Sequence, residues 1–208
     1  MTESETYTLA ESFDDERVRA ESGEANSQWS LGMRCEHGLG VAQDHTEAVR
    51  WYRLAANQGN ANAQFDLGRM YTEGRGVAQD DREAVGWYRL AADQGDAHAQ
   101  FNLGGMYDGG RGVAQDDTEA VQWYRKAAEQ GDESAQYNLG VMYGQGRGVA
   151  QDDTEAAHWY RLAAEQGNAA MQGFRDATRH PSTPQAVGAT PTRRGNAGDA
   201  GRPKGGRC

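Results

Sequence analysis

Apolar residues recur along this chain in a pattern with a period of 36 residues. Within residues 60–95, Ala63, Leu67 and Met70 follow one another at spacings of three and four residues, which is typical of a helix with one buried face. A second stretch, residues 84–92, follows a Gly-x-Gly turn and is apolar around most of a helical circumference. We therefore expect two helices in each period, helix A and then helix B, with helix B packed between its own helix A and the next one.

Polar residues and glycines mark the ends of these predicted helices. Asp80 stands three residues before Glu83, the spacing of a capping box in which each residue satisfies a free backbone amide of the other. Gly95 follows the last apolar residue of helix B and tolerates the left-handed conformation that ends helices. Glycine also occurs in the middle of helix A, at Gly68, Gly104 and Gly140. Because glycine there costs about 1 kcal/mol relative to alanine, we expect helix B to approach closely at these positions.

The period divides the chain into four units and two different ends. The units are predicted to be residues 24–59, 60–95, 96–131 and 132–167. Residues 1–23 end in a segment that aligns with helix B but carries charges in place of Trp-Tyr, which predicts a polar amino-terminal capping helix. Residues 168–180 begin like helix A but lose the Leu-Gly pair, and are predicted to form a carboxy-terminal capping helix. Residues 181–208 are rich in Pro, Thr, Gly and Arg, which predicts a disordered basic tail.

Repeats of this kind predict an all-α fold in which the helix pairs stack on one another. The composition agrees, because 37% hydrophobic residues and 28 glycines in a chain of 208 residues are lean for one compact core. Each unit of a stacked array needs to bury a face only against its neighbours. Arrays of this kind usually bind proteins, and the pattern does not say which protein.

Charge is distributed unevenly along the chain. The net charge is -10, and the segment from Asp176 onward carries +4, so residues 1–175 carry -14. An acidic body repels phosphate backbones, which argues against nucleic acid as the ligand of the repeats and favours a basic or mixed-charge protein partner. The basic tail is interpreted as a solvated extension. A different interpretation is that the tail binds the acidic body and gates it.

No targeting or membrane segment is visible in the sequence. Met1 is followed by Thr-Glu-Ser-Glu, without the basic start and the apolar run of about 7 to 15 residues that a signal peptide needs. No apolar run is long enough to cross a bilayer. The two cysteines, Cys35 and Cys208, are too few for a disulfide framework. We expect a cytoplasmic protein that does not bind a membrane.

Residues 63–95, AQFDLGRMYTEGRGVAQDDREAVGWYRLAADQG, resemble a Sel1-like repeat, a relative of the tetratricopeptide repeat. The motifs that carry the resemblance, among them Leu-Gly-x-x-Tyr, Gly-x-Gly-Val, Trp-Tyr and Gln-Gly, recur from residue 24 to residue 167. The resemblance implies a right-handed α-solenoid with helix A on its concave face. It also implies a non-catalytic scaffold or adaptor that binds peptides or protein partners in signalling and quality-control complexes.

The resemblance also points to candidate binding residues on helix A. In tetratricopeptide grooves the residue before Leu-Gly is often an asparagine that grips a bound peptide; here Asn102 and Asn138 occupy that position, with Asp66 and Ser30 in the other units. An amide can pair with a peptide group of an extended ligand, or it can bridge helices within the array. The aromatic residues one position earlier either form a ladder in the groove or pack in the core. The predicted groove residues are Phe65, Asp66, Arg69, Phe101, Asn102, Tyr137 and Asn138.

The sequence predicts no catalytic, metal or cofactor site. The Gly-x-Gly after each helix A lacks the third glycine, the preceding strand and the Gly-Lys-Ser/Thr ending of a phosphate loop, so it is interpreted as a turn. His37 and His45 flank one loop near Cys35, but Cys35 replaces the Tyr of the other units, and chance substitution explains it better than metal binding.

The alternative function is that of the cysteine-rich Sel1-like proteins described as β-lactam-binding or β-lactam-hydrolysing. Those proteins carry a disulfide pair in each repeat, which this chain lacks. The chain also contains no Ser-x-x-Lys motif, because the residues three before Lys126 and Lys204 are Trp123 and Gly201. We therefore expect a protein that is not an enzyme.

Overall fold

The computed structural model describes residues 14–179, and side-chain surroundings for residues 14–167. Within that part of the chain, every regular element is a helix. Residues 14–21 are helical, and the helices that follow are α2 (Ala25–His37), α3 (His45–Asn57), α4 (Ala61–Glu73), α5 (Asp81–Asp93), α6 (Ala97–Gly109), α7 (Asp117–Glu129), α8 (Glu133–Gln145) and α9 (Asp153–Arg179). The predicted all-α class is confirmed.

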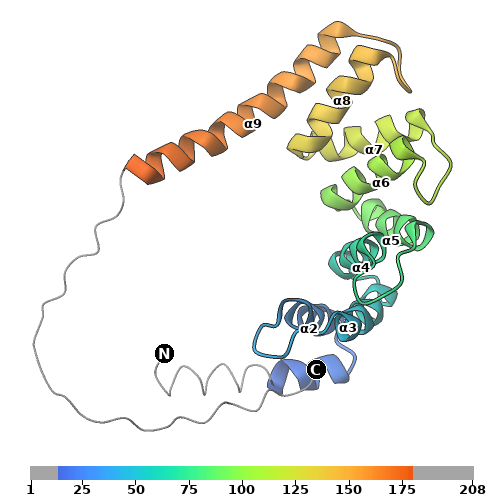
Figure 1. Cartoon of the computed structure of the whole chain (residues 1–208), viewed down its shortest axis with the longest axis vertical. Helices are drawn as coiled ribbons and strands as arrows, with labels where there is room; N and C mark the ends of the chain where they lie inside the picture. The colour runs from blue at the N-terminus through green and yellow to red at the C-terminus, as the bar shows by residue number, and fades with distance from the viewer. Residues whose placement is uncertain (1–13, 180–208) are drawn as a thin grey trace, which may run out of the picture.

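The helices stack in chain order, each against the one before it and the one after it. Figure 1 shows them as an arc in which α2, α4, α6 and α8, the helices A, lie on the inner side. Of the helices B, α3, α5 and α7 lie on the outer side, whereas α9 begins at the end of the arc and extends away from it on its open side. The predicted right-handed α-solenoid of stacked helix pairs is confirmed. No helix among the described residues is both long enough and apolar enough to cross a membrane.

The predicted start of helix B is confirmed, with one change in its hydrogen bonds. The Asp80 side chain accepts hydrogen bonds from the backbone amides of Arg82 and Glu83, at 2.9 and 3.2 Å. The amide of Asp80 itself donates to the carbonyl oxygen of Tyr71 at 3.0 Å, so it is not the partner of the Glu83 side chain. The reciprocal half of the capping box is therefore replaced by a bond to the end of helix A, which fixes the turn between the two helices.

The mid-helix glycines are explained by one aromatic contact. A Cβ added at Gly104 would lie 2.7 Å from Cδ1 of Tyr124, closer than side-chain carbons approach one another. Gly68 and Gly140 face the rings of Tyr88 and Tyr160 in the same way. Close approach of helix B is thus confirmed, and the tyrosine ring of the Trp-Tyr pair is what comes close.

Buried glutamine amides connect successive units. Gln64 donates to the carbonyl oxygen of Ala56 in the preceding helix B at 3.1 Å, and it accepts from Gln94 of its own helix B at 2.7 Å. The same side-chain pairs recur as Gln58 with Gln28, Gln130 with Gln100, and Gln166 with Gln136. Each amide satisfies buried polar groups that stacking would otherwise leave without partners.

The two ends of the described array differ. Ala20, in the helical segment 14–21, is buried and accepts a hydrogen bond from Gln28 at 3.0 Å, as Ala56 does from Gln64. That segment therefore acts as a helix B ahead of the first unit. At the other end α9 continues through Gly167 to Arg179 instead of breaking into the predicted separate cap at 168–180. Residues 168–179 lack the Leu-Gly pair with which each helix A packs against its helix B.

Two expectations fall wholly or partly outside the described residues. Residues 1–13 of the predicted amino-terminal cap and residues 180–208, which include the predicted tail, lie outside them. Cys35 is fully buried, and Cys208 lies outside the described residues.

Candidate functional site

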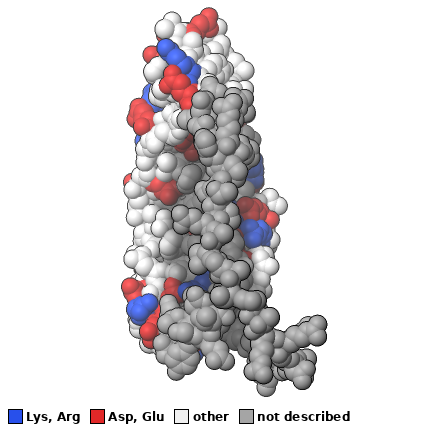
Figure 2. All heavy atoms as spheres, turned by 90° about the vertical axis from the view of Figure 1, so that its left-hand side faces the viewer, with Lys and Arg blue, Asp and Glu red and all other residues white. Residues whose placement is uncertain are grey.

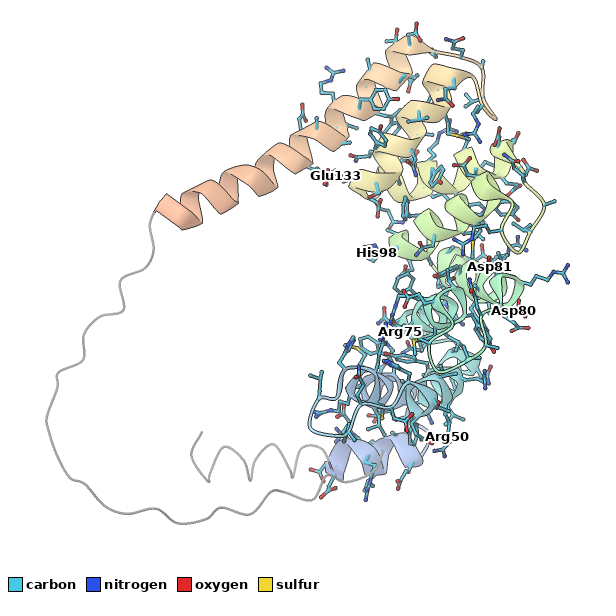
Figure 3. All side chains as sticks on the ribbon, viewed as in Figure 1. Arg50, Arg75, Asp80, Asp81, His98 and Glu133 are labelled. Atoms are coloured by element: carbon cyan, nitrogen blue, oxygen red, sulfur yellow. The ribbon has the colours of Figure 1, made fainter. Side chains whose placement is uncertain are left out.

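The predicted groove residues belong to α4, α6 and α8, which lie on the inner side of the arc (Figure 1). Three of them, Phe101, Tyr137 and Asn138, line one pocket of about 810 Å³. The other lining residues come from the start of α8 and from α9 and are Glu133, Ser134, Tyr160, Ala163 and Ala164. Figure 3 shows Glu133 and His98 on this inner side, whereas Asp80 and Arg50 lie on the outer side. We call this cavity the Tyr137 pocket.

The predicted aromatic ladder is only partly open. Phe65 lies 6.0 Å from the ring of Tyr88, and Phe101 lies 5.9 Å from the ring of Tyr124; both phenylalanines are half-buried. For these two, the core-packing interpretation holds. Tyr137 also contacts a tyrosine, but 56% of its surface is exposed. Of these three aromatic side chains, Tyr137 is therefore the one that is mainly exposed to solvent.

The two asparagines have different surroundings. The side-chain amide of Asn138 hydrogen-bonds the hydroxyl of Tyr124, as the internal-bridge interpretation expects. Burial, together with Asp108, raises the pKa of Tyr124 to about 12, so this hydroxyl stays protonated. Asn102 instead lines a second cavity of about 130 Å³, beside Phe101.

Asp66 and Arg69 are already paired within the chain. The indole of Trp29 donates to Asp66 at 2.8 Å, and the Arg69 guanidinium lies 3.2 Å from the same carboxylate. One Arg69 nitrogen also donates to both carboxylate oxygens of Glu36 at 2.7 Å. These two predicted groove residues therefore close the first part of the groove with an internal network.

Glu36 is the centre of that network, and sequence reasoning missed it. Its side chain is fully buried, accepts a hydrogen bond from the Tyr52 hydroxyl at 2.7 Å and pairs with Arg75 at 3.2 Å. Burial works to raise the pKa of Glu36, but the hydrogen bonds from Arg69 and Tyr52 hold it below its ordinary value. Burial raises the pKa of Asp66. The available signal was the repeat itself, since Glu36 aligns with Thr72, Asp108 and Gly144.

Charges on the open side of the arc are of both signs. Figure 2 views that side and shows acidic and basic side chains interspersed over its visible part rather than gathered into one patch. Among the described residues, no group of three or more His, Cys, Asp or Glu side chains is placed to hold a metal ion.

A family comparison accounts for the repeat pattern. The Sel1 repeat profile matches residues 25–60, 61–96, 97–132 and 133–168. The chain belongs to the Sel1 repeat family. Each match begins one residue after the corresponding predicted unit.

Solved Sel1 repeat structures resemble this one. The structure of a protective antigen from uropathogenic Escherichia coli, which displays an SLR fold, has 44% identity and a TM-score of 0.73, and the alignment covers 80% of this chain and 36% of that one. A Sel1 repeat protein from Oxalobacter formigenes has 40% identity and a TM-score of 0.69, with 75% of this chain and 62% of that one covered. This Sel1 chain thus spans less than two thirds of either protein. No curated protein matches the sequence.

Proposed function

We propose that this Sel1 repeat protein is a non-catalytic scaffold that binds a peptide or protein partner at the Tyr137 pocket. Sel1 repeat proteins are generally protein-interaction scaffolds. The single observation that carries the proposal is the exposed ring of Tyr137 beside a pocket of about 810 Å³ on the inner side of the arc.

The composition of the pocket supports a protein ligand. Tyrosine supplies a large contact area with few rotatable bonds, and such residues often dominate binding energy at interfaces. Ala163 and Ala164 on α9 add an apolar wall, while Ser134 and Glu133 place polar groups on the rim. An aromatic anchor with a polar, acidic rim fits a partner segment that presents an apolar side chain next to a basic one.

Among the residues that the structure describes, no further helix A packs against α9, and the Tyr137 pocket lies at this end of the array. Tyr160 is 38% exposed, whereas the equivalent Tyr124 in the preceding unit is 2% exposed. Residues that lie between units elsewhere in the array are therefore open to solvent beside the pocket. This supports binding by a partner segment that packs where a further repeat would pack.

The test is a Tyr137→Ala variant of the full chain. A partner captured from the native lysate by the unmodified protein is identified, and its dissociation constant is measured for both proteins by calorimetry. We expect at least a tenfold weaker complex, which corresponds to about 1.4 kcal/mol. Leu90→Ala, which truncates an apolar residue that is 48% exposed on the outer helix α5, is the matched control and should change the affinity less than about twofold.

Equal affinity of the Tyr137→Ala variant and the unmodified protein would remove the Tyr137 pocket from the interface. An equal loss in both variants would show that the partner does not distinguish the inner from the outer face. The β-lactam alternative is supported by no observation among the described residues. Measurable hydrolysis of nitrocefin by the purified protein would reopen it.

A further inference from the structure

Three equivalent junctions join the four units, and each is built around one tyrosine. At the first junction Tyr52 donates to Glu36, which also pairs with Arg75 of the next unit. At the third junction Tyr124 donates to Asp108 at 3.5 Å, and Asp108 pairs with Arg147 of the next unit. In both cases a carboxylate of the chain lies between a tyrosine hydroxyl and an arginine.

The second junction keeps the tyrosine and the arginine but has no carboxylate between them. Thr72 occupies the position of Glu36 and Asp108. Its hydroxyl donates to the carbonyl oxygen of Gly68 at 3.0 Å and lies 3.3 Å from the Tyr88 hydroxyl. The described residues offer Arg111 one carboxylate, Asp81 at 2.9 Å. The equivalent Arg75 and Arg147 each pair with two, Glu36 and Glu73 for the first, and Asp108 and Asp117 for the second.

A cavity of about 130 Å³ lies at the second junction, where the carboxylate is missing. It is lined by Thr72, Tyr88, Phe101, Asn102, Gly105, Met106 and Arg111. The cavity is open partly because Gly105 occupies the position of Arg69, whose long side chain reaches Glu36 at the first junction. The second junction thus has Thr72 where the first has Glu36, and Gly105 where the first has Arg69. The ion pair of the first junction is therefore absent from the second, and a cavity remains in its place.

The lining residues offer hydrogen-bond donors and no acid. Tyr88 carries a hydroxyl and Asn102 carries a side-chain amide. Arg111 carries a guanidinium that pairs with one carboxylate, Asp81, whereas the equivalent arginines pair with two. The Thr72 hydroxyl is already used as a donor to the carbonyl oxygen of Gly68. Because a guanidinium and neutral donors together favour an anion with two oxygen acceptors, a carboxylate suits this set better than a cation.

We propose that this cavity, the Arg111 pocket, binds a carboxylate of the peptide partner, either an aspartate or glutamate side chain or a chain terminus. The inference rests on the proposed function, because the pocket shares Phe101 with the Tyr137 pocket. Since a water molecule takes up about 30 Å³ in the liquid, the cavity has room for a carboxylate with one or two methylene groups and little more. The partner then presents an acidic anchor here and its apolar and basic residues toward α8.

The direct test uses small carboxylate probes with the full chain. N-acetyl-aspartate amide represents an acidic side chain, N-acetyl-alanine represents a chain terminus, and N-acetyl-asparagine amide is the neutral control. We expect at least one carboxylate probe to produce saturable shifts in the NMR signals of the Asn102 side-chain amide and the Gly105 backbone amide, and the neutral control to produce none. The probe that binds more tightly identifies the source of the carboxylate.

The matched variants are Thr72→Asp and Thr118→Asp. Thr72→Asp gives the second junction its own carboxylate, as at Asp108, and should weaken binding of the probe at least tenfold. Thr118→Asp adds the same charge at an exposed position in the first turn of α7 and should leave the probe affinity within about twofold. If Thr72→Asp does not fold, Arg111→Gln at the half-exposed guanidinium should give the same loss.

Saturation by the neutral probe at the same concentration, or equal binding by Thr72→Asp and the unmodified protein, would overturn the assignment. The affinity of the partner for the two variants distinguishes a failure of this assignment from a failure of the proposed function. A partner whose affinity falls in Tyr137→Ala but not in Thr72→Asp keeps the scaffold function and removes the carboxylate anchor. A partner unaffected by Tyr137→Ala removes the proposed function, while the probe titration still reports on the Arg111 pocket alone.

Discussion

The first and second junctions have the same helix arrangement and the same contact between a glycine and a tyrosine ring, but they differ in their polar side chains. At the first, the half-buried Asp66 and Arg69 form a cluster with the fully buried Glu36, which connects α2 to α4. At the second, the aligned residues are Thr72, Asn102 and Gly105, and a cavity of about 130 Å³ takes the place of the cluster. The residues at the positions of Glu36, Asp66 and Arg69 thus determine whether a junction contains an ion cluster or a cavity.

The difference separates two tasks of the repeat. The glycine, the tyrosine and the glutamine amides recur at both junctions and hold the units together. The positions of Glu36, Asp66 and Arg69 vary without disturbing that framework. A buried ion pair need not add stability, but removing one of its partners strongly destabilises the fold, because a charge is left buried without compensation. We therefore expect the first junction to be more sensitive to single substitutions than the second.

The largest effect is expected for Arg69→Met, which breaks the first junction. Arg69 is the main partner of the fully buried Glu36, and its loss leaves that carboxylate with Arg75 and Tyr52. Removing one partner of a buried pair typically costs about 3 to 5 kcal/mol. We expect a decrease in the free energy of unfolding at the lower end of that range, measured by urea denaturation.

Arg82→Met is the matched control for this substitution. Arg82 is exposed on α5 and makes no salt bridge among the described residues, so its replacement should change the free energy of unfolding by less than about 0.5 kcal/mol. Similar losses in the two variants would show that the Glu36 cluster does not distinguish the first junction.

The glycine contact should be equally sensitive at both junctions, because it belongs to the shared framework. A Cβ added at Gly32 would lie 2.7 Å from the Tyr52 ring, and one added at Gly68 would lie 2.7 Å from the Tyr88 ring. We expect Gly32→Ala and Gly68→Ala each to lower the free energy of unfolding by about 1 to 3 kcal/mol through overpacking.

Gly86→Ala shows what the same replacement does without a clash. Nothing lies within 4 Å of a Cβ added at Gly86, so alanine should stabilise α5 by about 0.5 to 1 kcal/mol. Losses at Gly32 and Gly68 that differ by more than about 1 kcal/mol would contradict a framework common to both junctions.

Acid should act on the first junction through Glu36, a buried carboxylate that the second junction lacks. Because the pKa of Glu36 is held below its ordinary value of 4.5, its contribution to stability is fully present above pH 4.5 and is lost as the pH falls below that value. The raised pKa of Asp66 acts in the opposite direction. We therefore expect the stability difference between the unmodified protein and Glu36→Gln to shrink as the pH falls below 4.5, measured by urea denaturation at several pH values.

The acid effect has an internal control in Glu47→Gln, on the outer face at α3, where the carboxylate forms a surface pair with Arg50. Its stability difference from the unmodified protein should stay small throughout the pH range. A difference for Glu36→Gln that stays constant below pH 4.5 would contradict the role given to the buried carboxylate.

Local features of the sequence predicted the fold well. The period, the Asp80 cap and Gly95 lie within a few residues of the structure they determine, and the mid-helix glycines correctly indicated close packing of helix B. The continuous α9 was not predicted, because Gly167-Asn168 has the same local sequence as Gly59-Asn60, which lies in a break between helices. The segment after Gly59-Asn60 carries the Leu-Gly pair that packs against helix B, and the segment after Gly167-Asn168 does not, which is a difference in tertiary contacts rather than in local sequence.

The sequence named part of the candidate site but not the contacts within it. The resemblance to tetratricopeptide grooves pointed to Phe101, Tyr137 and Asn138 on helix A, and these three residues line one pocket. It could not show that Asp66 and Arg69 are engaged with each other and with Glu36, because the Arg69 to Glu36 contact spans 33 residues. Comparing aligned positions between units, rather than each unit with an ideal helix, is what reveals both that cluster and the Arg111 pocket.

The smallest effect on the free energy of unfolding is expected for Asn102→Ala, at the position that aligns with Asp66 of the first junction. The aligned Asp66 accepts a hydrogen bond from Trp29 and pairs with Arg69, so Asp66→Ala leaves two donors without their acceptor and should cost about 1 to 3 kcal/mol. Asn102 is half-buried at the edge of the Arg111 pocket. Asn102→Ala should lower the free energy of unfolding by less than about 0.5 kcal/mol while weakening binding of the carboxylate probe. A loss of stability as large as that of Asp66→Ala would mean that Asn102 belongs to the framework, and that the second junction is not open for binding.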